Sequence, residues 1–138
     1  MIKCTPQEID TFNILNASLE AMRRAYEAMI GSCNLLLVDG NKVPKNMELD
    51  TLAVVKGDAR VAEIAAASIL AKVERDRQMY ELDAKYPEYH FAKHKGYPTK
   101  EHLLLLENLP ILDCYRKSYG PIKKLLLKTA TDEDLLLI

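Results

Sequence analysis

The sequence predicts an α/β domain in which short buried strands are flanked by helices. Two short apolar runs, Leu35–Val38 and Leu52–Val55, are bounded by turn residues, as buried strands are, although periodicity alone does not exclude a helix. Each run is followed by an aspartate, Asp39 or Asp58, and parallel strands would bring both carboxylates to the sheet edge where ligands bind. On spacing alone the structural interpretation is favoured, in which Asp39 opens a tight turn and Asp58 caps a helix.

The composition is that of one compact globular domain. The chain has 138 residues, of which 49% are hydrophobic and 28% charged, and this balance excludes a disordered protein. The formal net charge of -1 excludes a general polyanion binder, so a nucleic-acid site would be a local basic patch. The odd number of cysteines, without metal-ligand spacing, predicts reduced thiols in a cytoplasmic protein. We find no bilayer-spanning run and no signal-peptide pattern.

The first helix is predicted over residues 6–30. Thr5 is a suitable N-cap, Pro6 suits the first helical position, and Glu8 completes a capping box with Thr5. Gly31 is a typical stop signal. Apolar residues recur between these signals with helical spacing, so the helix needs a sheet or another helix to cover its apolar face.

A linker of twelve residues, 40–51, separates the two predicted strands. That length is at the lower limit for a parallel crossover, whereas a hairpin needs fewer residues, so the linker alone leaves the strand direction open. The chemistry considered below requires Asp39 and Asp58 to lie close together, which favours the parallel arrangement.

A second helix is predicted from Ala59 to Lys72, with Asp58 as its N-cap. Alanine and serine fill its middle, and small side chains allow a helix to approach a sheet closely. The helical pattern either continues or kinks into residues 73–85, before the Tyr86-Pro87 pair ends it.

Residues 89–99 are predicted to form a basic loop interleaved with aromatic side chains. Such a surface is suited to holding a phosphate and stacking on a sugar or base. Thr99 is expected to cap a helix over residues 100–108. His94 and His102 are candidate metal ligands or acid–base groups, and a structural hydrogen bond is the alternative for each.

The last third of the chain carries weaker signals. Pro110 interrupts the preceding helix, and residues 111–119 are predicted to form another short helix. Residues 129–138 form a leucine-bearing acidic tail without a structural assignment. Four basic side chains in this region either face a phosphate backbone or form a solvated surface: Arg116, Lys117, Lys123 and Lys124.

Several blocks of the sequence, in order along the chain, closely resemble bacterial ribonuclease HII: VDGN, VKGDARVAEIAAASILAKVERD, YPEYHFAKHKGYPTKEH and YRKSYGP. The segment QEIDTFNILNASLEAMRRA also resembles the helix that precedes the VDG strand in that family. The resemblance covers roughly residues 7–121. It implies a single, partial ribonuclease HII-type domain with a ribonuclease H-like fold, in which a mixed sheet is flanked by helices.

The resemblance implies a divalent-metal-dependent endoribonuclease. It implies hydrolysis of the RNA strand of RNA–DNA hybrids and incision on the 5′ side of single ribonucleotides embedded in DNA, as in ribonucleotide excision repair. Acidic side chains would bind magnesium or manganese, and a water would attack the scissile phosphate. Two hard cations held by carboxylates would stabilise the attacking and leaving oxygens together.

Residue by residue, the resemblance implies two catalytic metal ligands and a set of substrate contacts. Asp39 in VDG and Asp58 in KGD match the third and fourth catalytic carboxylates of the family. Tyr97 in HKGYPT matches the tyrosine that packs against the deoxyribose after the ribonucleotide junction. Phosphate contact or support is expected from five further residues: Lys56, Ser68, Lys72, His94 and Lys95.

The sequence departs from the family pattern in one respect. Family members begin with a strand that carries a D-E-A-G-R-G motif, which supplies the first two carboxylates and a clamp for the ribonucleotide 2′-hydroxyl, and the motif does not occur here. We therefore expect a chain that lacks the first three strands of the family and exposes an unpaired sheet edge. Three consequences stay open: the chain folds poorly, it self-associates by pairing through that edge, or it depends on a missing N-terminal segment. The alternative function is a catalytically inactive nucleic-acid-binding remnant, which keeps Tyr97 and Lys95 without a competent metal site.

Overall fold

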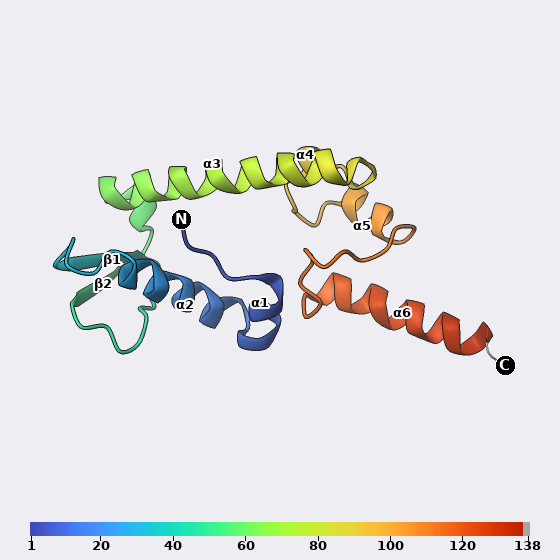
Figure 1. Ribbon diagram of the computed structural model, residues 1–138, viewed down its shortest axis with the longest axis horizontal. Coiled ribbons are helices and arrows are strands. Elements are labelled where there is room, and N and C mark those ends of the chain that lie inside the picture. The colour runs from blue at the N-terminus through green and yellow to red at the C-terminus, as the bar shows by residue number, and fades with distance from the viewer. Residues whose placement is uncertain (137–138) are drawn as a thin grey trace. The chain divides into compact units, whose positions relative to one another are not determined.

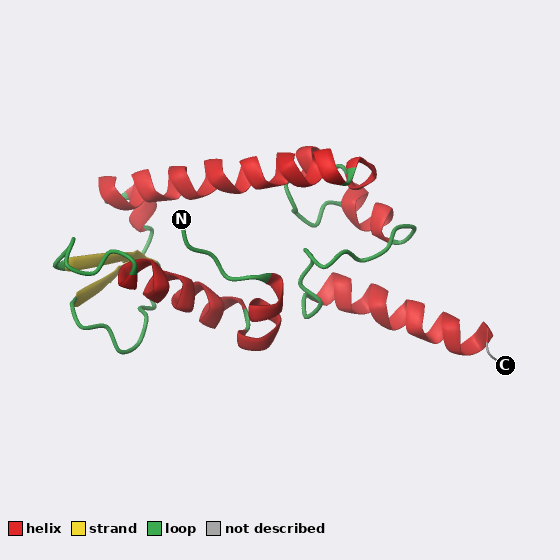
Figure 2. Ribbon diagram, viewed as in Figure 1, coloured by secondary structure: helices red, strands yellow, loops and turns green. Residues whose placement is uncertain are grey.

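The computed structural model describes residues 1–136, which form two compact units. The strand unit comprises residues 1–4 and 12–74, and the aromatic unit comprises residues 5–11 and the chain from Arg75 onward. Helices predominate in both units, and the strands of the described chain lie in the strand unit (Figure 1, Figure 2). No helix within residues 1–136 combines the length and the apolar character needed to cross a lipid bilayer.

The strand unit contains a two-stranded parallel sheet. β1 (Leu35–Asp39) pairs with β2 (Asp50–Val54), and the register places Leu35 opposite Asp50 and Asp39 opposite Val54. The parallel direction, which the linker length left open and the expected chemistry favoured, is therefore confirmed. Both strands occupy the predicted regions, although β2 starts and ends slightly earlier than the apolar run.

The opening region forms two helices instead of the single helix predicted over residues 6–30. α1 (Pro6–Phe12) and α2 (Ile14–Glu27) are separated by Asn13, whose φ of 68° lies in the left-handed region. The Asn13 side chain accepts a hydrogen bond from the Asn16 N–H at 3.0 Å and thereby caps α2. Asparagine tolerates this backbone conformation better than most residues. The apolar pattern continues across Asn13 and therefore does not signal the break.

The predicted capping box at the start of α1 is confirmed. The Thr5 N–H donates to the Glu8 carboxylate at 2.8 Å, and the Glu8 N–H donates to Thr5 Oγ1 at 3.2 Å. Two backbone N–H groups that have no partner within the helix are satisfied in this way.

The second predicted helix starts later than expected. A 3-10 turn, η1 (Gly57–Ala59), precedes α3 (Ala62–Lys85), so the prediction that Asp58 caps the helix is wrong. The Val61 N–H donates to the Gly57 carbonyl at 2.8 Å, and this bond closes the turn before the helix begins. α3 then continues through residues 73–85 as one helix.

The aromatic unit includes most of α1 and the second part of α3. Four further helical elements complete its described part: η2 (Pro87–Tyr89), α4 (Phe91–His94), α5 (Lys100–Leu106) and α6 (Gly120–Leu136). α4 lies within the stretch predicted as a loop. Thr99 caps α5 as predicted, because its hydroxyl oxygen accepts a hydrogen bond from the His102 N–H at 3.2 Å.

The prediction of a short helix over residues 111–119 is wrong. This stretch forms turns, and the N–H groups of Lys117 and Ser118 donate to the Asp10 carboxylate instead of to helical carbonyls. Residues 129–136, within the stretch predicted as a tail, belong to α6, and the last two residues lie outside the described part of the chain.

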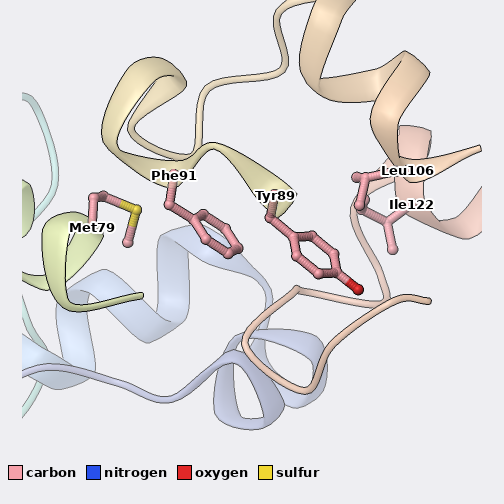
Figure 3. Close-up of a cluster of buried hydrophobic side chains, with 5 residues drawn as sticks. All are labelled: Met79, Tyr89, Phe91, Leu106 and Ile122. Carbon is pink, nitrogen blue, oxygen red and sulfur yellow. The ribbon is translucent and has the colours of Figure 1, made fainter. Parts of the chain in front are cut away.

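Five buried side chains form the hydrophobic core of the aromatic unit (Figure 3): Met79, Tyr89, Phe91, Leu106 and Ile122. Figure 3 shows the rings of Tyr89 and Phe91 side by side, and these rings stack with centroids 5.7 Å apart and planes 9° from parallel. The Tyr89 hydroxyl donates to the Pro110 carbonyl at 2.7 Å, which satisfies the polar end of a fully buried ring.

The small sheet carries large apolar side chains that the described chain leaves exposed. Val38 is buried, but Leu35 and Leu52 are 45% and 55% exposed, and Val55, in the turn directly after β2, is 55% exposed. Exposed apolar side chains also lie on α3: Ile69, Leu70 and Val73. Parallel sheets are ordinarily covered on both faces. This sheet has the apolar composition of such a sheet, but the described chain leaves part of its faces exposed.

Candidate active site

The two candidate catalytic aspartates follow the two parallel strands. Asp39 is the last residue of β1, and Asp58 lies in η1, a few residues after β2 ends at Val54. The Gly57 N–H donates to Asp39 Oδ1 at 2.8 Å, so the V-D-G and K-G-D segments are joined at one edge of the sheet. Parallel pairing is what brings them together, because the carboxyl ends of parallel strands share an edge.

The turn that carries Asp58 depends on one left-handed residue and one tightly packed glycine. Lys56 adopts a left-handed conformation, with φ 55° and ψ 42°, and its side chain is exposed. Gly57 is buried beside it, and a Cβ atom there would lie 2.6 Å from Ile64 Cδ1 and 3.3 Å from Asp39 Oδ1. The absence of a side chain at Gly57 therefore lets the backbone approach the Asp39 carboxylate closely.

Asp39 and Asp58 are suited in chemistry to a divalent cation but are few in number. Both side chains are exposed, and carboxylate oxygens are the ligands that Mg²⁺ prefers. Among the described side chains, those of residues 1–131, no group of three or more histidine, cysteine or acidic residues is placed to hold a metal ion. Two carboxylates fit one hydrated Mg²⁺ that also binds phosphate, and they are too few for a pair of cations.

Three of the candidate phosphate-contacting residues belong to the strand unit. Ser68 and Lys72 are exposed and four residues apart on α3, so they lie on the same face of the helix. Lys56 directly precedes η1, next to the turn that holds Asp58. Each of these side chains is accessible to a ligand.

Tyr97 belongs to the aromatic unit, and its side chain is 64% exposed while its backbone is held firmly. Its N–H donates to the His94 carbonyl at 2.8 Å, and its own carbonyl lies 2.8 Å from His102 Nδ1. An exposed aromatic ring on a constrained backbone is a suitable surface for stacking against a sugar or base.

His94 and His102 are buried, and both nitrogens of each ring have partners. His94 Nε2 lies 2.7 Å from the Tyr89 carbonyl, and Nδ1 accepts from the Gly96 N–H at 3.0 Å. His102 Nδ1 contacts the Tyr97 carbonyl, and Nε2 lies 2.7 Å from the Tyr115 hydroxyl. Burial lowers the pKa of both imidazoles. The geometry thus favours the structural alternative for both histidines, and for His94 it favours support over direct phosphate contact.

Lys95 occupies an unusual position next to Tyr97. Its Nζ is buried without a hydrogen-bond partner in the described chain and lies 3.3 Å from the centroid of the Tyr80 ring. Its backbone is left-handed, with φ 52°. The ammonium group is therefore stabilised by a cation–π contact in the described chain, and phosphate contact by Lys95 stays a prediction.

Sequence reasoning missed two groups that hold the aromatic unit together. Asp10 accepts hydrogen bonds from Lys117 N, Ser118 N and Ser118 Oγ at 2.9, 2.8 and 2.5 Å. Tyr115 supplies the partner of His102 Nε2. Each partner is distant in the sequence, so local patterns carried no signal for either contact.

Comparison with known proteins assigns the chain to a family. Residues 1–119 match the family model of ribonuclease HII. This chain belongs to the ribonuclease HII family. It is 52% identical over 124 residues to ribonuclease HII of Vibrio vulnificus (strain YJ016), covering 90% of this chain and 59% of that protein. It is 50% identical over 135 residues to ribonuclease HII of Colwellia psychrerythraea, covering 90% of this chain and 62% of that protein.

A third relative gives the same result. Ribonuclease HII of Vibrio cholerae serotype O1 (strain M66-2) is 51% identical over 124 residues, covering 90% of this chain and 60% of that protein. The chain thus spans about three fifths of the length of the curated relatives it matches. The family resemblance inferred from the V-D-G, K-G-D and H-K-G-Y-P-T blocks is confirmed.

Proposed function

We propose that this chain acts in an endoribonuclease of the ribonuclease HII type. The substrates are RNA–DNA hybrids, in which the RNA strand is hydrolysed, and DNA with single embedded ribonucleotides, which is cut on their 5′ side for excision repair. The observation that carries the proposal is the 2.8 Å hydrogen bond from Gly57 N to Asp39 Oδ1. It supports the proposal because it holds the two carboxylate-bearing segments at one sheet edge.

Asp39 and Asp58 are proposed as ligands of Mg²⁺ or Mn²⁺ in this enzyme. A bound cation would stabilise the charge that develops on the phosphate oxygens and lower the pKa of a bound water. Tyr97 is proposed to pack against the deoxyribose beside the ribonucleotide, and Lys56, Ser68 and Lys95 to assist phosphate binding. His94 is proposed to support the Tyr97 turn, since both of its ring nitrogens have backbone partners.

The working site requires more acidic ligands than Asp39 and Asp58. We propose that the complete sheet has further strands, including one with the D-E-A-G-R-G motif, which pair with its free edge as part of a larger fold that covers its faces. The exposed Leu35, Leu52 and Val55 support this proposal, because parallel sheets are ordinarily buried on both faces. Self-association is the alternative, in which the free sheet edge pairs with that of a second copy.

A second candidate function is nucleic-acid binding without catalysis. It is favoured by the absence of any cluster of three potential metal ligands among the described side chains of residues 1–131. Tyr97 is exposed and its backbone held, so a binding surface remains even where the metal site is incomplete.

Cleavage of a labelled DNA duplex with one embedded ribonucleotide tests the proposed activity. We expect metal-dependent cutting once the further acidic ligands are supplied, and we expect Asp39→Asn to reduce it by more than about a hundredfold, since loss of a metal ligand costs more than loss of a group that only orients one. Asp50→Asn is the matched control, because Asp50 starts β2 at the opposite edge of the sheet and should leave cutting unchanged.

Two outcomes would redirect the proposal. Cutting in the presence of a chelator, or equal cutting by Asp39→Asn, would remove Asp39 from the metal site. Binding without cutting would favour the second candidate function. In that case a separate polypeptide with the D-E-A-G-R-G strands of a family member should restore cutting if the site is only incomplete.

A further inference from the structure

The backbone of Tyr97 lies in a closed ring of hydrogen bonds. Its carbonyl accepts from the Thr99 N–H and contacts His102 Nδ1, both at 2.8 Å. Thr99 Oγ1 in turn accepts from the His102 N–H at 3.2 Å. The backbone N–H and the imidazole of His102 therefore hold the two ends of the same short segment. Because Thr99 is the N-cap of α5, this ring couples the Tyr97 turn to the start of a helix.

The hydrogen-bond partners determine which nitrogen of each buried imidazole carries the proton. A backbone carbonyl only accepts, so His102 Nδ1 is the protonated nitrogen and Nε2 accepts from the Tyr115 hydroxyl. His94 has the opposite tautomer, since its Nδ1 accepts from the Gly96 N–H and its Nε2 donates to the Tyr89 carbonyl. The two rings stack with centroids 3.5 Å apart and planes 10° from parallel.

The stacked pair leaves neither imidazole free for proton transfer or metal binding. Both side chains are buried, at 6% and 3% exposure, and all four ring nitrogens have hydrogen-bond partners within the aromatic unit. Tyr97, which lies between the two histidines in the sequence, is 64% exposed. The contacts are thus arranged around one residue with an exposed aromatic side chain, and the backbone N–H and carbonyl of that residue are both hydrogen-bonded.

We infer that His102 is a positioning residue for Tyr97, holding its carbonyl through Nδ1–H while Tyr115 and the stacked His94 hold the His102 ring. The inference rests on the proposed contact between Tyr97 and nucleic acid. It adds a specificity role for two side chains, His102 and Tyr115, that themselves touch no substrate. A tyrosine held in one orientation loses less conformational entropy when it stacks on a sugar.

Two substitutions at position 102 separate this role from a general contribution to folding. Asn places its amide nitrogen near the position of Nδ1, so His102→Asn keeps a donor for the Tyr97 carbonyl and loses the contact with Tyr115. Gln reaches the position of Nε2, so His102→Gln keeps a partner for Tyr115 and loses the contact with Tyr97. Both variants lose the stacked ring, so this loss cancels in the comparison.

Hydrogen exchange and binding report the two halves of the inference. We expect exchange of the Tyr97 and Thr99 amides to accelerate about five- to tenfold in His102→Gln relative to His102→Asn, the effect of one net hydrogen bond. Binding of a duplex with one ribonucleotide, followed by anisotropy in a chelator, should weaken by a similar factor. Adding His102→Gln to Tyr97→Ala should weaken binding no further, because the positioning residue acts only through Tyr97.

The outcomes distinguish this inference from the proposed function. Equal amide exchange in the two variants, or additive losses of binding in the double variant, would overturn the positioning role. Unchanged binding by Tyr97→Ala alone would instead remove Tyr97 from the substrate site. Nitrogen-15 NMR of the wild-type imidazoles needs no variant to fold, and a His102 ring protonated at Nε2 instead of Nδ1 would also overturn the inference.

Discussion

Gly57 directly precedes Asp58 and donates a hydrogen bond to Asp39, at a position with little room for a side chain. A Cβ atom would lie 2.6 Å from Ile64 Cδ1, closer than real Cβ contacts, and 3.3 Å from Asp39 Oδ1. Either Ile64 or the K-G-D turn must move to accept a methyl group. The residue is therefore needed both for packing against α3 and for the hydrogen bond to Asp39.

We expect Gly57→Ala to lower the free energy of unfolding by about 1–3 kcal/mol, the usual cost of overpacking a buried site. Urea unfolding of the whole chain measures this change. Gly120→Ala is the matched control, because nothing lies within 4 Å of the added Cβ and the expected change is within about 0.5 kcal/mol. Equal stability of the two variants would show that the turn adapts to a side chain.

The stacked His94 and His102 rings make folding sensitive to mild acid. Burial lowers the pKa of each imidazole below 6.5. The positive charge of a protonated His90 lowers the pKa of His94 further, whereas the Glu101 and Asp83 carboxylates raise it. His94 also lowers the pKa of His102, whose other titratable contact is Tyr115. The unfolded chain therefore binds protons that the folded chain does not. The stabilising contribution is complete above pH 6.5 and is lost as the pH falls toward the folded-state values.

We expect the urea midpoint to fall as the pH is lowered from about 8 to about 5, with each histidine contributing up to about 1.4 kcal/mol per pH unit. His102→Asn should reduce this pH dependence. His90→Gln is the control and should largely retain it, since the His90 side chain is 49% exposed. A midpoint that stayed constant or rose in mild acid would contradict the neutral tautomers assigned to the pair.

At the scale of elements, α1 is tied to the distant 116–119 turn by one carboxylate. Asp10 accepts from two backbone N–H groups and one hydroxyl of Lys117 and Ser118. Gln7, on the same helix, donates to the Asp113 carbonyl at 3.1 Å. These contacts satisfy N–H groups that would otherwise favour a helix there, and they explain why the predicted short helix over residues 111–119 does not form.

We expect Asp10→Asn to destabilise the aromatic unit by about 1 kcal/mol, because charge-assisted hydrogen bonds contribute more than neutral ones but this group is partly exposed. The hydrogen bond from the Ser118 hydroxyl, partly opposed by burial, lowers the pKa of Asp10 below 3.8. Its contribution is present above pH 3.8 and is lost as the pH falls below that value.

Thermal unfolding at neutral pH, followed by near-ultraviolet circular dichroism of the tyrosines, measures the effect of Asp10→Asn. Asp113→Asn is the control, because it removes a carboxylate from the turn without removing a backbone hydrogen bond. If both variants lost the same stability, the effect would be one of net charge and not of the contact with Lys117 and Ser118.

At the scale of the whole molecule, the two units differ in how well they are packed. The aromatic unit has a core around Tyr89 and Phe91, and the buried Tyr89 hydroxyl has a hydrogen-bond partner. The strand unit leaves Leu35 and Leu52 exposed on a two-stranded parallel sheet, and Val55 exposed in the turn after β2. If a polypeptide with the D-E-A-G-R-G strands restores cutting, the strands that complete the sheet also complete the metal site.

The sequence alone was sufficient for features that depend on neighbouring residues. The capping box of Thr5 and Glu8 and the Thr99 cap of α5 are local, because each involves backbone groups within one turn. The two strands were predictable as apolar runs bounded by turn residues, and the family from several ordered motif blocks. The roles of Asp39, Asp58 and Tyr97 come from the same blocks and stay proposals.

Only the tertiary structure decided which distant groups meet. The break at Asn13 escaped the apolar pattern because a left-handed residue can cap a helix without changing that pattern. The roles of His94 and His102 depended on partners up to thirteen residues away, and that of Asp10 on partners more than a hundred residues away. Hydrogen bonding and stacking depend on distance in space, and a one-dimensional pattern records that distance only when the partners are neighbours.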